Sequence, residues 1–533
     1  MTLKAAFYFF FVCFVLLAEL SYGQSKNLIT IERSNEGSYD ETSGLKVRKL
    51  IGSVILRQND IQLFCDSAYL YVDQNKATAM GFVRILQPGK MDATSRYLEY
   101  DGNTKDAFLR DKVFITDGEM TLQTDVVFYN TSSKQAFYPG PATITNAEAK
   151  LKSKKGRYDS NLKQFFFREN VVLTHPDFDL EGDTLHYQTV QKKADFFGPT
   201  HIRTDRSYTY TEGGWFKTQT RESFLTKNGR VTIDSVQFIR ADTLYFHDKE
   251  ERGYCKGRVQ IIDTTEKSEI RGGFVRFDRK KGTTLAYDFP LMLNFAEPDT
   301  LYLTADTLFQ SKAKDSSNLL RAWPMPVIKN KDLLLICDSM SYIQADSVFQ
   351  FFRLPVIWSA DFQITSKYME LFTIGSEFDR LEMYEDGFML KQEDSIRFSQ
   401  VKGKDMVARF KDRQMSRIDI KGNGESIYYV EREDGSLMGA NKIESSDITI
   451  FMEDNRPVDI RFYVKPVAVL HPIDKVNPFE FRLKGFRWEG EKYKLASSRM
   501  EEASICSPDQ GWYSYLKITP SGAEPAPTIQ LQD

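Results

Sequence analysis

The stretch LQTDVVFYNTSSKQAFYPGPATITNAEAK, residues 122–150, is one copy of a unit that recurs every 29 residues. Leu122, Leu151 and Leu180 each open such a unit, and each is followed seven residues later by a tyrosine. A fixed period of this kind is the signature of a repeat architecture, in which each unit packs only against its neighbours. Lysines mark the same 29-residue step between runs, at Lys76, Lys105, Lys134, Lys163 and Lys192.

Each unit has the composition of two strands joined by a turn. Aromatic residues make up 13% of the 533-residue chain, and they alternate with Val, Ile and Thr in short runs. These residue types favour strands over helices. We therefore expect an all-β fold, an elongated array of two-strand units of 29 residues.

The first strand of each unit contains two apolar pairs of opposite parity. Leu122 and Thr124 have one parity, whereas Val127 and Tyr129 have the other, and Asp125 lies between the pairs. Side chains of a regular strand alternate between its faces, so both pairs can face one core only if the phase slips by a residue. A β-bulge at the Asp would produce this slip and bend the strand. We expect the Asp on the outside of the bend and a sheet folded over into a V or a flattened roll.

Carboxylates recur at the expected bend and are the strongest candidates for a chemical site. Stacked carboxylates could bind calcium or act as the acid pairs of a β-solenoid glycosidase. However, Lys154 interrupts the row, and Asp next to Ser or Thr typically caps a bend through local hydrogen bonds. We therefore interpret the row as structural and predict no enzyme, no catalytic residue, no metal site and no cofactor. The row consists of Asp66, Asp125, Asp183, Asp242, Asp306 and Asp338.

The two ends of the chain differ from the repeats. A lysine at position 4, an apolar run and small residues before position 24 are typical of a cleaved secretory signal. A retained membrane anchor is the weaker alternative, because the run is shorter than the ~20 residues that a span needs. The net charge of −3 and the scattered basic residues predict no nucleic-acid partner. The expected parts are a signal peptide (1–23), a flexible leader (24–48), the repeat array (49–400), degenerate β repeats (401–512) and a disordered tail (513–533).

Four cysteines follow the predicted signal peptide. An even number in an exported protein permits disulfides, but the spacing selects none of the three possible pairings. Cys65 and Cys337 occupy a position that is small in the other units, so we interpret them as small buried side chains. No C-x-x-C occurs, which argues against a thiolate zinc site. The other two cysteines are Cys255 and Cys506.

Two recurring motifs carry a resemblance to a known family. The first strand reads LFCDSAY at residues 63–69 and LEGDTLHY at 180–187, and the second strand reads KATAMGFVRI at 76–85. In these motifs the chain resembles the OstA-like family, relatives of the periplasmic LptA bridge and of the N-terminal part of the LptD translocon. The resemblance covers residues 49–400 and extends more loosely to about 512. It implies a β-jelly-roll, or β-taco, that shields the acyl chains of lipopolysaccharide between the inner and outer membranes.

The resemblance also implies where the chain acts and what it contacts. The expected location is the periplasm, with association with the outer membrane left open. The expected partners are lipopolysaccharide and other β-jelly-roll components, from the inner-membrane complex to the outer-membrane translocon, which would pair edge to edge. The chain is longer than an LptA-type protomer and lacks the strands of an LptD barrel. The residues expected to line a lipid groove are Leu63, Leu122, Leu151, Leu180, Ile239, Leu303, Leu335, Ile364, Val113, Ile115, Ile144, Val171, Leu173 and Ile202.

The periodicity leaves one question open. If the two faces of the folded sheet stay apart, the apolar row lines a groove; if they meet, it is a dry core. In the second case, the chain is an exported β-repeat scaffold that binds protein or polysaccharide on its outer face.

Overall fold

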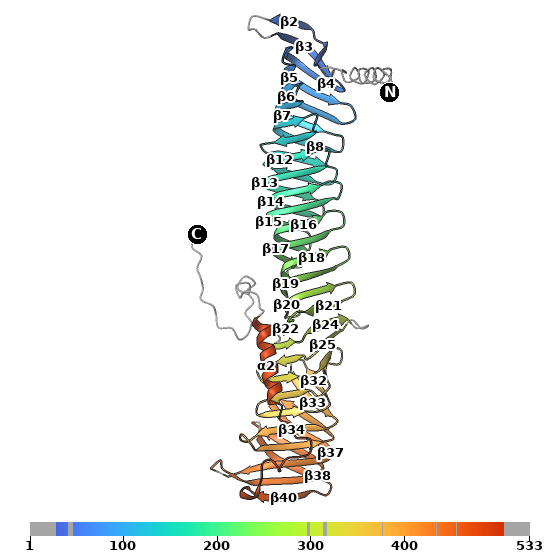
Figure 1. The fold of residues 1–533 in the computed structure, drawn as a ribbon. Coiled ribbons are helices and arrows are strands. Elements are labelled where there is room, and N and C mark those ends of the chain that lie inside the picture. Colours follow the sequence, from blue (N-terminus) through green and yellow to red (C-terminus); the bar gives the residue numbers. More distant parts are fainter. Residues whose placement is uncertain are drawn as a thin grey trace, which may run out of the picture. The chain divides into compact units, whose positions relative to one another are not determined.

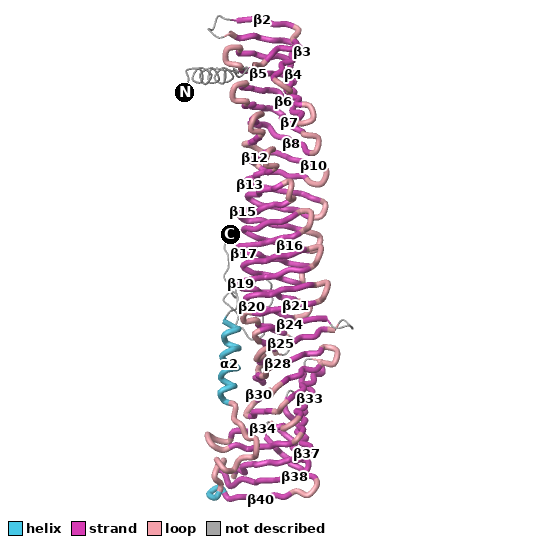
Figure 2. The backbone as a smooth tube through the Cα atoms, turned by 45° about the vertical axis from the view of Figure 1, so that its right-hand side comes forward, coloured by secondary structure: helices cyan, strands magenta, loops and turns pink. Residues whose placement is uncertain are grey.

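The computed structural model describes residues 28–40, 46–295, 299–312 and 317–505, apart from residues 376, 413, 433 and 455. These residues fall into two compact units, one up to residue 202 and the other from residue 203. Each is built almost entirely from antiparallel strands, which confirms the expected all-β fold (Figure 1 and Figure 2). The predicted signal peptide and the predicted tail lie outside the described residues.

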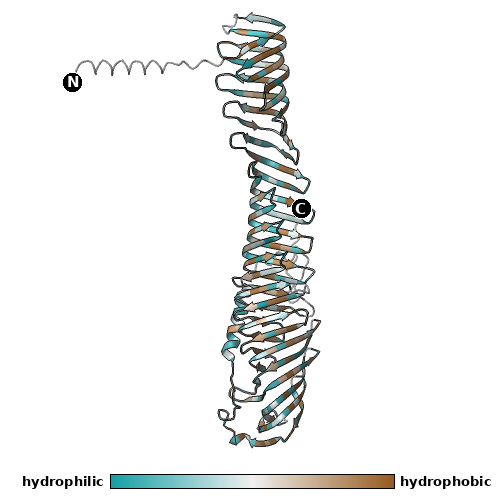
Figure 3. Cartoon of the chain, turned by 90° about the vertical axis from the view of Figure 1, so that its right-hand side faces the viewer, coloured by the Kyte–Doolittle hydropathy of each residue, from teal (hydrophilic) through white to brown (hydrophobic). Residues whose placement is uncertain are grey.

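In the first unit, most strands are 11 or 12 residues long and pair with the next strand of the chain. Hydrophobic and hydrophilic residues alternate along them (Figure 3). The strands are β1 (Thr30–Arg33), β2 (Glu36–Asp40), β3 (Val47–Gln58), β4 (Ile61–Tyr71), β5 (Lys76–Gln87), β6 (Met91–Asp101), β7 (Asp106–Thr116), β8 (Met120–Asn130), β9 (Gln135–Tyr138), β10 (Ala142–Asn146), β11 (Lys150–Ser153), β12 (Lys155–Asp159), β13 (Gln164–His175), β14 (Phe178–Gln188) and β15 (Lys193–Arg203).

The N-terminal edge differs from the expected flexible leader over residues 24–48. β1 pairs with the second half of β3, and β2 pairs with its first half. The polar composition of this stretch suggested a loop. It forms strands because the edge of β3 offers backbone hydrogen-bonding groups that need partners.

Left-handed turn residues explain the 29-residue lysine step. Lys105, Lys134 and Lys163 each have a positive φ. The carbonyl oxygen of each accepts a hydrogen bond from the first residue of the next turn on the same side, as in Ser160 N–H to Lys134 O at 3.1 Å. In the first such turn this position is Asn75 rather than Lys76, and Asn tolerates the left-handed conformation more easily than other non-glycine residues.

The second unit begins with strands of 11 or 12 residues and continues mostly with shorter strands, several of which pair with a strand other than the next one. Its strands are β16 (Ser207–Lys217), β17 (Glu222–Ile233), β18 (Gln237–His247), β19 (Arg252–Asp263), β20 (Ser268–Asp278), β21 (Thr283–Tyr287), β22 (Leu291–Asn294), β23 (Leu301–Thr304), β24 (Thr307–Lys312), β25 (Asn318–Trp323), β26 (Val327–Lys329), β27 (Leu333–Ile336), β28 (Ser339–Ile343), β29 (Val348–Phe352), β30 (Val356–Ser359), β31 (Phe362–Thr365), β32 (Tyr368–Ile374), β33 (Glu377–Tyr384), β34 (Gly387–Gln392), β35 (Phe398–Gly403), β36 (Asp405–Lys411), β37 (Gln414–Glu431), β38 (Leu437–Glu453), β39 (Arg456–Tyr463) and β40 (Val467–Pro472).

Strands continue as far as β40, but the described residues after it, 473–505, form none, which differs from the degenerate β repeats expected as far as residue 512. A 3-10 turn, η2 (Ile473–Lys475), leads into an irregular segment and then a helix, α2 (Gly490–Ile505). We call residues 473–505 the C-terminal strap. Figure 2 shows α2 lying beside the strands of the second unit.

The C-terminal strap covers apolar side chains on the outside of the second unit. Ala496 and Met500 of α2 belong to one buried cluster with Val327 and Val356 of the strands. Farther along, Leu483 joins a second cluster around β34 and β35. The strap is therefore a packed layer, because it removes outward-facing apolar surface from water.

Candidate functional site

The interior of the bent strands holds the predicted apolar row. In β4, Leu63 and Cys65 are buried, Asp66 is exposed, and Ala68 and Leu70 are buried. The burial changes parity at the Asp. This pattern confirms the predicted phase slip and the position of the carboxylate outside the bend.

The extra residue of each bend lies in the neighbouring strand rather than beside the Asp. Between β5 and β6, Met80 pairs with Tyr97 and Val83 pairs with Ser95, so β5 carries one residue more than β6. We expected the bulge in the first strand of each unit, and this location was wrong. The longer strand, β5, can accommodate its extra residue because a glycine, Gly81, adopts a positive φ there.

The aspartates at the bends accept hydrogen bonds from these longer strands. The Asp66 carboxylate accepts a hydrogen bond from the backbone N–H of Phe82 at 2.8 Å. Asp242 instead forms two hydrogen bonds with the guanidinium of Arg258, at 2.9 and 2.5 Å. Both contacts tie one bent strand to the next, which supports the structural interpretation of the carboxylate row.

Where a lysine replaces the aspartate, the charges are reversed. Lys367 lies 3.1 Å from Glu385 and 3.5 Å from Asp386, both at the neighbouring bend. Near the Lys154 bend, Lys155 donates a hydrogen bond to Glu169 at 2.6 Å, and this bond lowers the pKa of the Glu169 carboxyl. The exceptions in the sequence thus keep the cross-strand attraction with the signs exchanged.

The structure places all fourteen predicted lining residues on the inner side of the strands or at its margin. Three of them, Ile115, Leu122 and Ile144, are only half-buried. They are direct neighbours, since Leu122 pairs with Ile115 on one side and with Ile144 on the other. The buried ones are Leu63, Val113, Leu151, Val171, Leu173, Leu180, Ile202, Ile239, Leu303, Leu335 and Ile364.

The half-buried group lies where the regular pairing is interrupted. The strand after β8 is split into β9 and β10, and the residues between these halves include Gly140 and Pro141. Proline has no N–H to give to a ladder, so a continuous strand cannot pass through it. The interior is therefore less covered around Leu122 than in the regular repeats on either side.

Away from this group, two interior cavities are small. The first unit encloses a cavity of about 40 Å³ lined by Leu56, Leu63 and Leu98 among others. The second unit has an equally small one, of about 40 Å³, beside Ile364 and Leu381. Ligand pockets generally begin at roughly 300 Å³. The buried side chains of the row therefore pack as an apolar core around these two cavities.

Hydrogen bonds join the two margins of the folded sheet, which are the turns at opposite ends of the bent strands. Gln58, at one margin, accepts a hydrogen bond from the Tyr100 hydroxyl at 2.5 Å and donates one to the Gly102 carbonyl at 3.4 Å. Burial raises the pKa of Tyr100. In the second unit, Arg279 donates across the margins to Gln237, and burial lowers the pKa of this arginine.

The cysteines of the described residues are free and buried. Burial raises the pKa of Cys65 and of Cys255 to about 12, and it also raises the pKa of Cys337. These thiols therefore remain protonated at neutral pH, as expected for small side chains in a core. Cys506 lies outside the described residues.

Comparison with known families identifies the N-terminal part of the chain. Residues 26–183 match the family model described as OstA-like protein. This segment is similar to the OstA-like family, and we call it the OstA-like segment. The family resemblance read from the repeats is thereby confirmed for residues 26–183, which include the most regular bends. Curated proteins gave no match.

A solved structure similar to part of the chain is LptH of Pseudomonas aeruginosa, described as the LptA homologous periplasmic component of the conserved lipopolysaccharide transport device. The identity is 17%, and the match covers 19% of this chain and 76% of LptH. The TM-score is 0.18, so this likeness carries no argument for the fold or the function.

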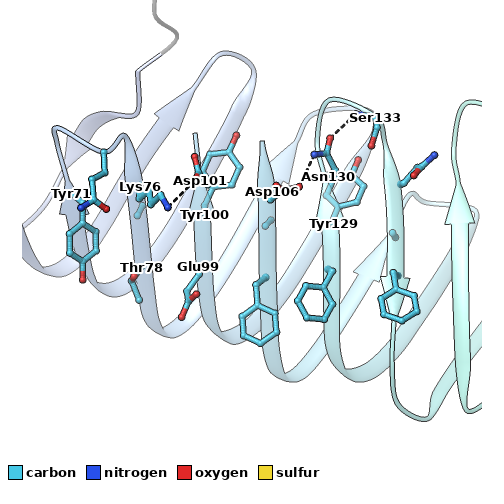
Figure 4. A pocket seen from close by; sticks show the side chains of 18 of the residues that line it. Tyr71, Lys76, Thr78, Glu99, Tyr100, Asp101, Asp106, Tyr129, Asn130 and Ser133 are labelled. Carbon is cyan, nitrogen blue, oxygen red and sulfur yellow. Dashed lines mark hydrogen bonds and ion pairs between the residues drawn. The ribbon is translucent and has the colours of Figure 1, made fainter. Parts of the chain in front are cut away.

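The outer face of the OstA-like segment carries an aromatic row that sequence reasoning did not single out. Phe108, Phe128 and Phe137 are cross-strand neighbours, with ring centroids 4.9 and 6.2 Å apart. They help to line a cavity of about 450 Å³ together with Thr78 and Glu99 (Figure 4). The sequence did contain an indication of this row, because aromatic residues occupy outward-facing positions in successive strands.

Two further properties concern only the described part of the chain. It contains no group of three or more His, Cys, Asp or Glu side chains that could hold a metal ion. Its helices are too short or too polar to cross a membrane.

Proposed function

We propose that the protein shields the acyl chains of lipopolysaccharide inside its bent sheet while they pass through the periplasm from the inner to the outer membrane. The chain would thereby contribute to outer-membrane assembly without being an enzyme. The observation that carries the proposal is the inner row of apolar side chains, which is present in the OstA-like segment and again in the second unit. The half-buried group around Leu122 would be the place where the lipid first contacts the interior.

The proposal includes partners at the end of the strand array. Within the described residues, β39 and β40 pair only with β38, which leaves their outer backbone groups without strand partners. Val458 and Val467 on these strands are well exposed. An open edge of this kind can take up a strand of another sheet, so we propose edge-to-edge pairing with other β-jelly-roll transport components.

In-cell photocrosslinking tests the lipid proposal directly. A photoreactive residue at Leu122 should give a lipopolysaccharide adduct, whereas the same residue at Gln123 should give none. Leu122 faces the interior and Gln123 is its exposed neighbour on β8, so the two differ in facing but hardly in position. No adduct at either site, in protein shown to be folded and exported, would overturn the proposal. Lipid at Gln123 alone would overturn the interior route.

The second candidate is an exported scaffold with a closed core that binds protein or polysaccharide on its outside. Two observations favour it: the interior cavities are small, and the row of Phe108, Phe128 and Phe137, of which Phe128 and Phe137 are exposed, borders a larger one. Exposed aromatic patches commonly mark interaction sites. Loss of partner binding in the Phe128→Ala variant, with Leu122 adducts absent, would favour this candidate over lipid transport.

A further inference from the structure

A large cleft lies on the outside of the second unit, away from the apolar row. Its volume is about 1140 Å³, well above that of the interior cavities. One part of its wall consists of successive bends, from Lys367 to Lys465, and another consists of residues 484–487 of the C-terminal strap. The cleft therefore exists only while the strap is docked on the strands.

The cleft has an excess of positive charge. It is lined by six cationic and three acidic side chains, although the whole chain has a net charge of −3. The local excess is thus a property of this site rather than of the composition. The cations are Lys367, Lys402, Lys404, Lys465, Lys484 and Arg487, and the acids are Asp386, Glu425 and Glu444.

The three acids are already engaged. Lys402 lies 2.8 Å from Glu425, and Lys367 lies 3.5 Å from Asp386. Glu444 pairs at 3.2 Å with Lys442, which is not part of the cleft lining. The acids thus do not neutralise the remaining cations of the cleft.

Four cations are left over: Lys404 and Lys465 from the bends, and Lys484 and Arg487 from the strap. None of them forms an ion pair with any other residue that the structure describes, and all four are exposed. Exposed like charges repel one another, and nothing in the packing of the strap requires two of them here. An anionic ligand would remove this repulsion.

The cleft favours phosphate over a single small anion. Arginine binds phosphate through paired N–H groups, and lysine binds it as a point charge. The hydroxyl group of Ser446 and the amide of Asn423 add neutral hydrogen-bonding groups to the wall. A volume of about 1140 Å³ exceeds what one phosphate needs and matches a larger polar molecule.

We propose that this cleft binds a polar headgroup or saccharide that carries two or more phosphate groups. The bend lysines and the strap cations hold phosphates from two sides, and the neutral groups contact the sugar-like part. The site goes beyond the proposed function, since it lies outside the apolar interior and does not depend on acyl-chain binding.

Calorimetry with inorganic triphosphate and the full chain tests the site. Replacing Lys404, Lys465, Lys484 and Arg487 together by Gln should weaken binding by at least about tenfold, because several charge-assisted contacts are lost. A matched control replaces four exposed lysines of the same unit outside the cleft, Lys267, Lys329, Lys331 and Lys411, by Gln. The control should keep the wild-type affinity, and that affinity should fall with added salt. Equal loss in both variants, or no binding by the wild type, would overturn the proposal.

Vesicles distinguish the source of the phosphate. Flotation with phosphatidylcholine vesicles that contain a phosphatidylinositol bisphosphate, but not with phosphatidylcholine alone, would assign a lipid headgroup if the four-residue variant abolishes it. Triphosphate binding without vesicle binding would assign a soluble phosphorylated ligand. If polyglutamate displaces triphosphate at equal charge, the cleft does not select phosphate over carboxylate and the phosphate proposal is wrong. The Leu122 adduct is scored separately, so failure here leaves the interior route untouched.

Discussion

Gly81 shows how a single residue fixes the bend of a repeat. Its φ is +93°, and a Cβ atom built on it would overlap the Asp66 carboxylate. That carboxylate must stay close because it accepts the hydrogen bond from Phe82 N–H. The aspartate, the glycine and the extra residue of β5 therefore fix the bend together.

Gly81→Ala should lower the free energy of unfolding by more than the backbone term alone. The positive φ costs roughly 1–2 kcal/mol for a residue with a Cβ, and displacement of Asp66 adds to it. Gly89→Ala is the control, since Gly89 also has a positive φ but has no atom within 4 Å of the added Cβ. Urea unfolding of both variants measures the difference. Equal losses would show that Asp66 does not constrain the bend, and Asp66→Ala should recover part of the loss in Gly81→Ala.

At the scale of the element, the turns of the first unit are stacked by backbone hydrogen bonds. The Lys134 carbonyl receives the N–H of Ser160, and the same pattern recurs at Lys105 and Lys163. The periodicity of the lysines therefore reflects the backbone conformation of the turns as well as the charge of the side chain. The first of these turns departs from it because Asn75, rather than Lys76, has the left-handed conformation.

Substitutions at Lys134 should rank by their tolerance of a positive φ. Lys134→Gly is expected to be neutral or stabilising, whereas Lys134→Val should cost on the order of 1–2 kcal/mol, because a β-branched side chain opposes this conformation. The order should reverse at Lys152, an exposed residue of β11, where Val suits a strand and Gly does not. Thermal unfolding of the four variants checks the ranking. The same order at both positions would contradict the assignment of the turn.

At the scale of the molecule, two buried glutamines hold the C-terminal strap on the second unit. Gln363 donates to the Arg487 carbonyl at 2.8 Å and accepts from Glu489 N–H at 2.7 Å. Gln400 makes the corresponding pair of bonds with Phe481 O and Leu483 N–H, at 3.1 and 2.9 Å. Each side chain amide thus satisfies two backbone groups of a segment that has no strand partner.

Gln363→Leu should loosen the strap without unfolding the strands. The change leaves two backbone groups of the strap without partners, at about 1–3 kcal/mol each. Trypsin cleavage after Lys484 and Arg487 should accelerate by about tenfold or more, as read by mass spectrometry. Gln414→Leu, at an exposed position of β37, is the control and should leave the cleavage rate unchanged. Unchanged cleavage in Gln363→Leu would mean that the apolar contacts of α2 alone hold the strap.

Local pattern was enough to determine much of this protein from its sequence. The 29-residue period, the all-β fold, the phase slip at Asp66 and the inner position of residues such as Leu180 follow from side-chain alternation within one unit. The sequence pattern was insufficient where the two strands of neighbouring repeats pair with each other. The extra residue lies opposite the Asp rather than beside it, because a bulge is defined by a pair of strands and not by one.

Only the tertiary structure decided how far the interior closes and what covers the outside. Gln58 reaches Tyr100 across the margins over a sequence separation that no repeat pattern encodes. The strap returns to Gln363 from 126 residues farther along the chain, and its cations complete the cleft with the bend lysines. Such contacts depend on the path of the chain in space, whereas a periodic sequence records only what each residue does within its own strand.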